Sequence, residues 1–327
     1  MPAYGFLAIG VALLAIGGES ALRGACGMAR WVGMSPLFIG LLIVSAMSAA
    51  PELLVALQAA AHGSGDLAFG TIAGSNIVNA LFAAGAAAMM RPLPGSPKLV
   101  LRDGGFMILA SAIAVLAAME GRAGEVVGLA LIGMLAVYLL VCFFTDWRRP
   151  TPLSISATRG SLFARDRLPN LSTTALLFAF GLVCLYFGAF YAVHGAIDIA
   201  RDFRVSQGVA GLTVLAIGAS LPQIAVTVIA AARRDVDMAV GNLIGANVFG
   251  LLAVLGIVAL VHPLAISPSL VQDGWVMLAS AVVLVLFLTI GWRVTRLQGL
   301  VLVICYAVYL GFLAWRQGLL PLAGLGF

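Results

Sequence analysis

The sequence is poor in charge. Its 18 Lys and Arg and 13 Asp and Glu make up 9% of the 327 residues, whereas about a quarter of the residues in a soluble domain are charged. This shortage excludes a soluble enzyme and a disordered chain. It also excludes a nucleic-acid-binding protein, although the net charge is +5.

Cysteine and histidine are also scarce. The four cysteines are far apart and form no CxxC motif, and the three histidines stand at the ends of hydrophobic runs. We interpret the cysteines as reduced packing residues, and we expect neither a disulfide framework nor a resident cofactor. Because no hydrophobic run holds a Ser/His/Asp or Cys/His set, the sequence does not indicate an enzyme.

Hydrophobic residues dominate instead, at 62% of the chain. They are grouped in runs close to the roughly 20 residues that a membrane-spanning helix needs. The pattern predicts an all-α integral membrane protein with ten transmembrane helices, the first of them a retained helix and not a signal peptide. The expected spans are 4–22, 36–61, 67–90, 104–119, 125–144, 173–199, 206–232, 238–261, 273–291 and 298–315.

The basic residues are divided unequally between the two sides of this layout. With the N-terminus outside, fourteen of the 18 fall in inner loops or the linker and four on the outer side. The positive-inside rule therefore predicts that both termini are outside and that the central linker is cytoplasmic. We expect a bacterial inner (plasma) membrane protein in contact with lipid and not with nucleic acid. No residue pattern specifies an oligomeric state.

The polar, basic linker at 146–171 separates two halves, residues 1–145 and 172–327, with five expected helices each. Since five is odd, the second half enters the membrane from the opposite side. A repeat is visible at an offset of 171 residues, where 40–85 matches 211–256 at 14 of 46 positions. The matches include residues that a hydrophobic background does not repeat by chance, namely Pro51/Pro222, Asp66/Asp237, Gly70/Gly241, Gly74/Gly245 and Asn76/Asn247. The sequence thus predicts two inverted five-helix repeats.

Each half also has a proline near the middle of a span, Pro51 and Pro222. Proline removes a backbone donor and leaves nearby carbonyls poorly satisfied, which is costly in hydrocarbon unless they face protein or a polar cavity. Broken helices at matching positions of inverted halves are typical of the midplane site of a transporter.

The two repeat segments resemble the α-repeats of the sodium/calcium exchanger family, within the calcium/cation antiporters. The family motifs are G-[TS]-S-x-P-E followed by G-[SA]-N-[IV]-x-[ND]. The matching segments here are MSAAPE at 47–52 and GSNIVN at 74–79 in the first half, and GASLPQ at 218–223 and GANVFG at 245–250 in the second. The resemblance implies the ten-helix exchanger fold and cation antiport.

Polar residues of the first repeat converge by helical spacing. Ser45, Ser48 and Glu52 share one helix face, and Ser75 and Asn79 share a face of the next helix. Their oxygens suit hard cations such as Na⁺ or Ca²⁺. In the resembled family the matching positions hold the ion, which implies further ligands from the second half at Ser220, Gln223 and the backbone carbonyl of Ala216. Asn76 and Asn247 are either ligands or caps of freed backbone.

The second repeat departs from the family pattern. Ala219 and Ala246 replace hydroxyl residues, Gln223 replaces the second glutamate, and Gly250 replaces an acidic or amide residue. Glu52 is then the one acidic residue near the middle of a span. A single carboxylate suits Na⁺, or Ca²⁺ weakly, and can alternate between a proton and a cation. We expect alternating-access antiport of Na⁺, Ca²⁺ or H⁺ around Glu52. The alternatives are a proton-coupled or monovalent cation exchanger, and a transport-incompetent relative that binds or regulates.

Overall fold

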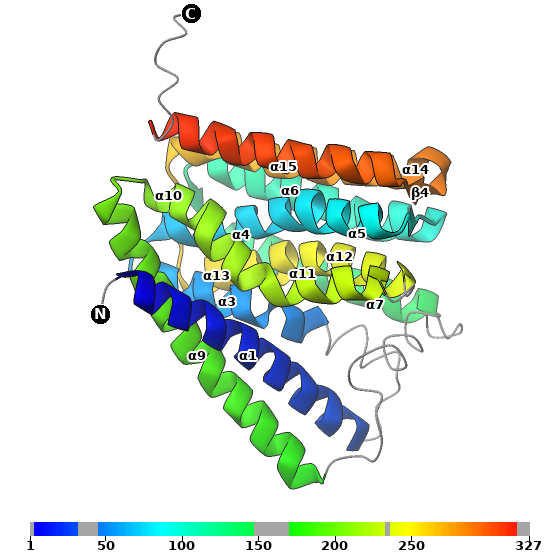
Figure 1. Cartoon of the computed structure of the whole chain (residues 1–327), viewed down its shortest axis with the longest axis horizontal. Coiled ribbons are helices and arrows are strands. Elements are labelled where there is room, and N and C mark those ends of the chain that lie inside the picture. The colour runs from blue at the N-terminus through cyan, green and yellow to red at the C-terminus, as the bar shows by residue number, and fades with distance from the viewer. Residues whose placement is uncertain (1–2, 32–44, 147–169, 233–235, 319–327) are drawn as a thin grey trace, which may run out of the picture.

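The computed structural model describes residues 3–31, 45–146, 170–232 and 236–318, which are mostly helical (Figure 1). Most of the predicted linker, and the start of the span predicted at 36–61, lie outside the described residues. The first half comprises α1 (Ala3–Trp31), α3 (Ser45–Ala61), α4 (Gly65–Ile77), η2 (Val78–Ala83), α5 (Ala84–Met90), β1 (Leu93–Pro94), η3 (Leu99–Gly104), α6 (Gly105–Met119), β2 (Arg122–Ala123) and α7 (Glu125–Asp146).

The second half repeats this order from α9 onward. Here η4 and η5 are π-helical, as η2 and η3 are in the first half, and η6 and η7 are single 3₁₀ turns. The elements are α9 (Leu171–Asp202), α10 (Gln207–Ala210), η4 (Gly211–Leu215), α11 (Ala216–Ala232), α12 (Val236–Phe249), η5 (Gly250–Leu255), α13 (Gly256–Val261), β3 (Leu264–Ala265), η6 (Pro268–Leu270), α14 (Val271–Thr289), η7 (Ile290–Trp292), β4 (Arg293–Val294) and α15 (Arg296–Arg316).

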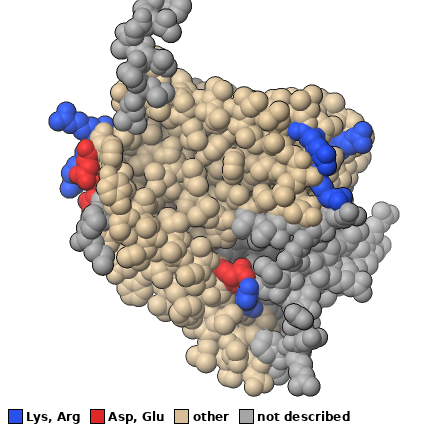
Figure 2. All heavy atoms as spheres, viewed as in Figure 1, with Lys and Arg blue, Asp and Glu red and all other residues tan. Residues whose placement is uncertain are grey.

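Each of the ten predicted spans has a helical counterpart. Among the described residues, nine helices are long and apolar enough to cross a membrane, and the shorter apolar helix Ala49–Ala61 belongs to the tenth. The charged residues on the face shown in Figure 2 gather mainly at the two ends of the bundle, with one further acidic and basic group beside the undescribed segment. The chain is therefore an all-α integral membrane protein.

The first helix is longer than the hydrophobic run predicted. α1 continues to Trp31, beyond the predicted end at residue 22. The reason is local: Arg23 Nε donates to Glu19 one turn earlier at 2.8 Å, so two charged residues are accommodated on the helix surface.

Two short antiparallel bridges show the inverted repeat directly. Leu93 pairs with Val294, and Ala123 pairs with Leu264. Adding 171 to the first-half residue of either pair gives the second-half residue of the other, so the two bridges are repeat equivalents. The offset found in the sequence therefore holds in the backbone pairing between the halves.

α1 and α9 form a tightly packed pair that slants across the other helices (Figure 1). A Cβ atom built on Gly10 would lie 2.4 Å from the backbone nitrogen of Ala192, and one on Gly181 would lie 2.3 Å from that of Ala21. These contacts are again related by 171 residues. Because only glycine permits such close backbone approach, α1 and α9 pack as one unit.

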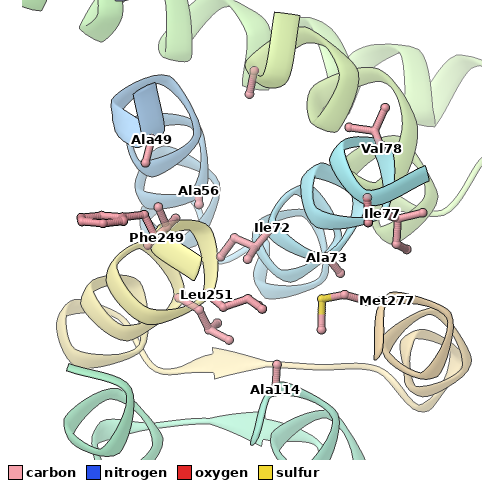
Figure 3. Packing of buried hydrophobic residues seen from close by; sticks show 14 of the residues in the cluster. Ala49, Ala56, Ile72, Ala73, Ile77, Val78, Ala114, Phe249, Leu251 and Met277 are labelled. Carbon is pink, nitrogen blue, oxygen red and sulfur yellow. The ribbon is translucent and has the colours of Figure 1, made fainter. Parts of the chain in front are cut away.

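The repeat helices α4 and α12 lie in the interior. A Cβ on Gly70 would lie 2.5 Å from the carbonyl oxygen of Gly208, and one on Gly74 would lie 2.5 Å from that of Leu212, so α4 touches the backbone of α10 and η4. Around them, apolar side chains of several helices interdigitate, including Ile72, Leu251, Met277 and Ala114 (Figure 3). This packing fixes the positions of the polar residues between α3, α4, α11 and α12.

Candidate cation site

The two prolines lie against the same point of α1. A Cβ built on Gly18 would be 3.3 Å from Cγ of Pro51 and 3.6 Å from Cγ of Pro222. The helices do not break at the prolines, since both α3 and α11 continue through them. The irregular backbone lies earlier in the second half, in the π-helical segment η4 that leads into α11. The prediction of a break at each proline is thus corrected for the described residues.

Glu52 is buried without an ion-pair partner in the described structure. Its side chain lies on α3 with 1% of the residue exposed, and Oε1 makes no hydrogen bond. The other two buried acidic residues of the described chain are paired. Asp103 accepts from Arg102 at 2.7 Å, and Asp273 accepts from Arg316 at 2.8 Å and from Tyr309 at 2.9 Å.

Two contacts join α4 and η2 of the first half to α11 of the second half. Asn79 Nδ2 donates to Gln223 Oε1 at 3.0 Å, and Ser75 Oγ lies 3.4 Å from the carbonyl oxygen of Ala216, to which it donates. All four residues are buried. Glu52 itself faces the second half at η5, because a Cβ on Gly250 would lie 3.2 Å from Glu52 Oε1.

π-helical backbone occurs at equivalent places in both halves. Asn79 lies in η2, and its repeat partner Gly250 is the first residue of η5. A π turn inserts an extra residue in the helix and changes where side chains point, and such turns are frequent at functional sites. Here the two segments bring positions 79 and 250 against α11 and α3, respectively.

Several buried oxygens of this region have no hydrogen-bond partner in the part of the chain that the structure describes. A buried polar atom of this kind costs about 1–3 kcal/mol, so it indicates a missing partner. All are oxygens, the ligand type that Na⁺ and Ca²⁺ prefer. They are Glu52 Oε1, Asn76 Oδ1, Asn79 Oδ1, Ser220 Oγ and Asn247 Oδ1.

The structure joins four of the eight residues that the sequence singled out, in two separate pairs. Ser75 contacts the carbonyl of Ala216, Asn79 contacts Gln223, and Ser220 is buried on α11. Ser45 and Ser48 lie on α3, but their side chains are outside the described part of the structure.

Of the two asparagines, Asn76 makes a backbone cap, whereas the amide of Asn247 contacts a side chain. Asn76 Nδ2 caps the carbonyl of Ile72 at 2.9 Å, while its Oδ1 is unpaired. Asn247 Nδ2 lies 3.5 Å from Met107 Sδ, and its Oδ1 is likewise unpaired. The contact of Gly250 with Glu52 was not predicted. The repeat alignment held the signal, since Asn79 and Gly250 are equivalent positions.

Two inverted membrane repeats with a buried set of oxygens where they meet define a membrane ion-transport protein by class. The family model described as "Sodium/calcium exchanger protein" matches residues 2–144 and 173–315. The chain therefore belongs to the sodium/calcium exchanger family.

Relatives match over nearly the full length. The chain is 32% identical to CaxA of Alkalimonas amylolytica, over 93% of this chain and 96% of CaxA. It is 32% identical to the inner membrane protein YrbG of Escherichia coli, over 97% and 98%. It is 26% identical to the sodium/calcium exchanger MaX1 of Methanosarcina acetivorans, over 93% and 96%. A solved structure of the sodium-calcium exchanger NCX_Mj, soaked with Na⁺ and Ca²⁺, superposes with a TM-score of 0.64 at 25% identity, over 95% of this chain and 99% of that one.

Proposed function

We propose that this chain is a secondary active antiporter that exchanges cations across the membrane, with Glu52 as the charged ligand. The unpaired, buried oxygen of Glu52 carries the proposal. A lone acidic group inside a membrane helix is costly and is rarely retained for packing alone. Membership of the sodium/calcium exchanger family, and the names of relatives such as MaX1, support cation exchange.

The ligand set favours Na⁺, or weakly bound Ca²⁺. Glu52 supplies one negative charge, and the other proposed ligands are neutral: Ser45, Ser48, Ser75, Asn79, Ser220, Gln223 and the carbonyl of Ala216. Calcium affinity rises with the number of charged ligands, so a single carboxylate indicates a modest Ca²⁺ site. H⁺ is the third candidate, since a carboxylate can take a proton in place of a metal ion.

Alternating access would come from movement of α1 and α9 as one unit over α3 and α11. α1 and α9 pack backbone to backbone at glycines, whereas α1 meets Pro51 and Pro222 of the site helices through Gly18. A Cβ built on Gly218 of α11 lies 3.9 Å from the Cβ of Val11 on α1, a distance that suits a disulfide.

Cross-linking tests this movement. In a chain without native cysteines, oxidising Val11→Cys/Gly218→Cys is expected to stop exchange, because it ties α1 to α11, and reduction is expected to restore it. The matched controls are the single variants Val11→Cys and Gly218→Cys under the same oxidant, because neither can form the cross-link. Exchange should persist in both. Full activity of the oxidised α1–α11 cross-link would contradict the movement.

Flux in everted inner-membrane vesicles tests the function itself. We expect imposed Na⁺ or pH gradients to drive uptake of radioactive Ca²⁺ or Na⁺ above that of vesicles without the protein. Absence of flux under every gradient would instead support the transport-incompetent alternative, which the losses at Ala219, Gln223, Ala246 and Gly250 motivate.

The same vesicles report the orientation. We propose an inner-membrane location with both termini outside and the linker 146–171, between halves 1–145 and 172–327, in the cytoplasm. A cysteine at Ser156 should then react with a membrane-impermeant maleimide in everted vesicles and not in intact cells. Labelling in intact cells and not in everted vesicles would show that the linker is outside and contradict the proposed orientation.

A further inference from the structure

Two helices that move past each other in the proposed mechanism, α3 and α9, meet at a pair of histidines. His62 directly follows the last residue of α3, and His194 lies on α9. The centres of their rings are 4.9 Å apart, and the ring planes cross at 87°. Because α3 carries Glu52 and α9 packs against α1, this contact joins a site helix to the α1–α9 pair.

The two rings use one nitrogen in the same way. His62 Nδ1 lies 2.7 Å from the carbonyl oxygen of Gln58, and His194 Nδ1 lies 2.8 Å from that of Phe190. Since a carbonyl oxygen only accepts, Nδ1 is the donor in both rings. In the neutral ring Nε2 then keeps a free lone pair, and neither Nε2 has a hydrogen-bond partner among the described residues. Metal-binding histidines are commonly held in this manner, with the second nitrogen donating to a backbone carbonyl.

The distance between the rings suits two ligands of one metal ion. With Zn–N bonds of about 2.0–2.1 Å, the centres of two imidazoles on one tetrahedral ion are about 5 Å apart, and the rings here are 4.9 Å apart. His62 is exposed and His194 is partly exposed, so an ion in water can reach them. Imidazole nitrogens suit Zn²⁺, whereas Na⁺ and Ca²⁺ prefer oxygen ligands. The pair therefore differs in chemistry from the oxygens around Glu52.

The surroundings favour a cation at this end of the repeat and not at the other. Asp198 lies one turn beyond His194 on the same face of α9, and it forms no ion pair within the described residues. The offset of 171 residues puts Arg233 and Arg23 at the positions equivalent to His62 and His194. Arginine has no lone pair to give to a metal ion. The histidine pair thus has no metal-binding counterpart in the repeat.

We propose that His62 and His194 form a Zn²⁺ site, in which the two Nε2 atoms bind one ion and water completes the coordination. The bound ion holds α9 to α3 and so prevents the movement of the α1–α9 pair over the site helices. Zn²⁺ then inhibits exchange from outside the transport site. This effect on exchange rests on the proposed function, whereas the binding of the ion does not.

Equilibrium binding of radioactive Zn²⁺ to the purified full chain, in saturating Na⁺, tests the site. His62→Gln and His194→Gln are each expected to weaken the affinity about 10-fold or more. The double variant should bind no more weakly than the single variants, because one ion needs both rings. His262→Gln is the matched control, since it removes the third histidine of the chain and leaves the pair intact. Unchanged affinity in both single variants would overturn the inference, and so would a loss of half the bound Zn²⁺ in each, which would indicate two separate ions.

Thermal unfolding separates a metal site from a packing contact. In a zinc-selective chelator, the single variants and the unaltered protein should unfold at similar temperatures. Added Zn²⁺ should raise the unfolding temperature of the unaltered protein and of His262→Gln, and not that of His62→Gln or His194→Gln. If the two variants are less stable by the same amount in chelator and in Zn²⁺, the rings only pack against each other and the inference fails.

Exchange in proteoliposomes, with Zn²⁺ on both sides, tests the inhibition. Zn²⁺ should reduce gradient-driven uptake of radioactive Na⁺ by the unaltered protein, and a membrane-permeant zinc-selective chelator should restore it. The ratio of uptake in Zn²⁺ to uptake in chelator should rise towards one in His62→Gln and His194→Gln. An equal ratio in the variants and the unaltered protein would overturn the inhibitory role. Absence of uptake by the unaltered protein in chelator would instead contradict the proposed function, while the binding experiment still decides the Zn²⁺ site.

Discussion

Glu52→Gln is expected to reduce cation exchange to the background of vesicles without the protein, while the protein remains folded. Glutamine keeps the size of the side chain and removes the negative charge. Because the remaining proposed ligands are neutral, the variant has no negative charge at the site to offset the dehydration of a cation in the membrane interior. Losing a charge-assisted contact of about 3 kcal/mol corresponds to more than 100-fold in affinity. The measurement is gradient-driven uptake of radioactive Na⁺ or Ca²⁺.

Glu125→Gln is the matched control for this variant. Glu125 is exposed at the start of α7. Its replacement by glutamine therefore changes the net charge by the same amount without touching the site. It should exchange like the unaltered protein. Equal activity of Glu52→Gln and Glu125→Gln under every imposed gradient would remove Glu52 from the mechanism.

Gln223→Glu is expected to strengthen Ca²⁺ binding about 10-fold or more, with a smaller effect on Na⁺. The substitution places a second carboxylate beside Asn79, at a position that is buried and contacts the first half. Two carboxylates raise Ca²⁺ affinity because a divalent ion gains more from each added charge. Without a cation, the two buried charges repel each other, so the variant should be less stable in chelator than the unaltered protein.

Thermal unfolding in detergent, titrated with Ca²⁺ and with Na⁺, measures both effects. Gln272→Glu adds the same charge at an exposed position of α14 and should change neither titration. An unchanged Ca²⁺ titration in Gln223→Glu would mean that residue 223 does not face the bound ion.

The fold was largely predictable because its main constraints are local or periodic. Hydrophobic runs gave the spans, and the 171-residue offset predicted the inverted halves, which the pairing of Leu93 with Val294 and of Ala123 with Leu264 bears out. Helix ends were less predictable. α1 extends beyond its hydrophobic run because Glu19 and Arg23 neutralise each other on its surface. Hydropathy alone does not detect such a pair.

Sequence reasoning singled out the candidate site residues but not the contacts between them. Glu52 stood out because an acidic group in mid-span is costly. The hydrogen bond between Asn79 and Gln223 joins residues 144 positions apart, and Asn79 lies in the π turn of η2. Residue spacing predicts α-helical faces and gives no sign of such a turn. For the same reason, the close approach of Gly250 to Glu52 emerges only when the two halves are packed together.

The most direct test of the central claim, that a cation binds at Glu52, is a cation titration of the purified protein and of Glu52→Gln, followed by thermal unfolding. A ligand at 100 times its dissociation constant stabilises the folded state by about 2.7 kcal/mol, which is a shift of several degrees. We predict that Na⁺ or Ca²⁺ produces this shift in the unaltered protein and that neither does so in Glu52→Gln. The same shift in both proteins would contradict the account.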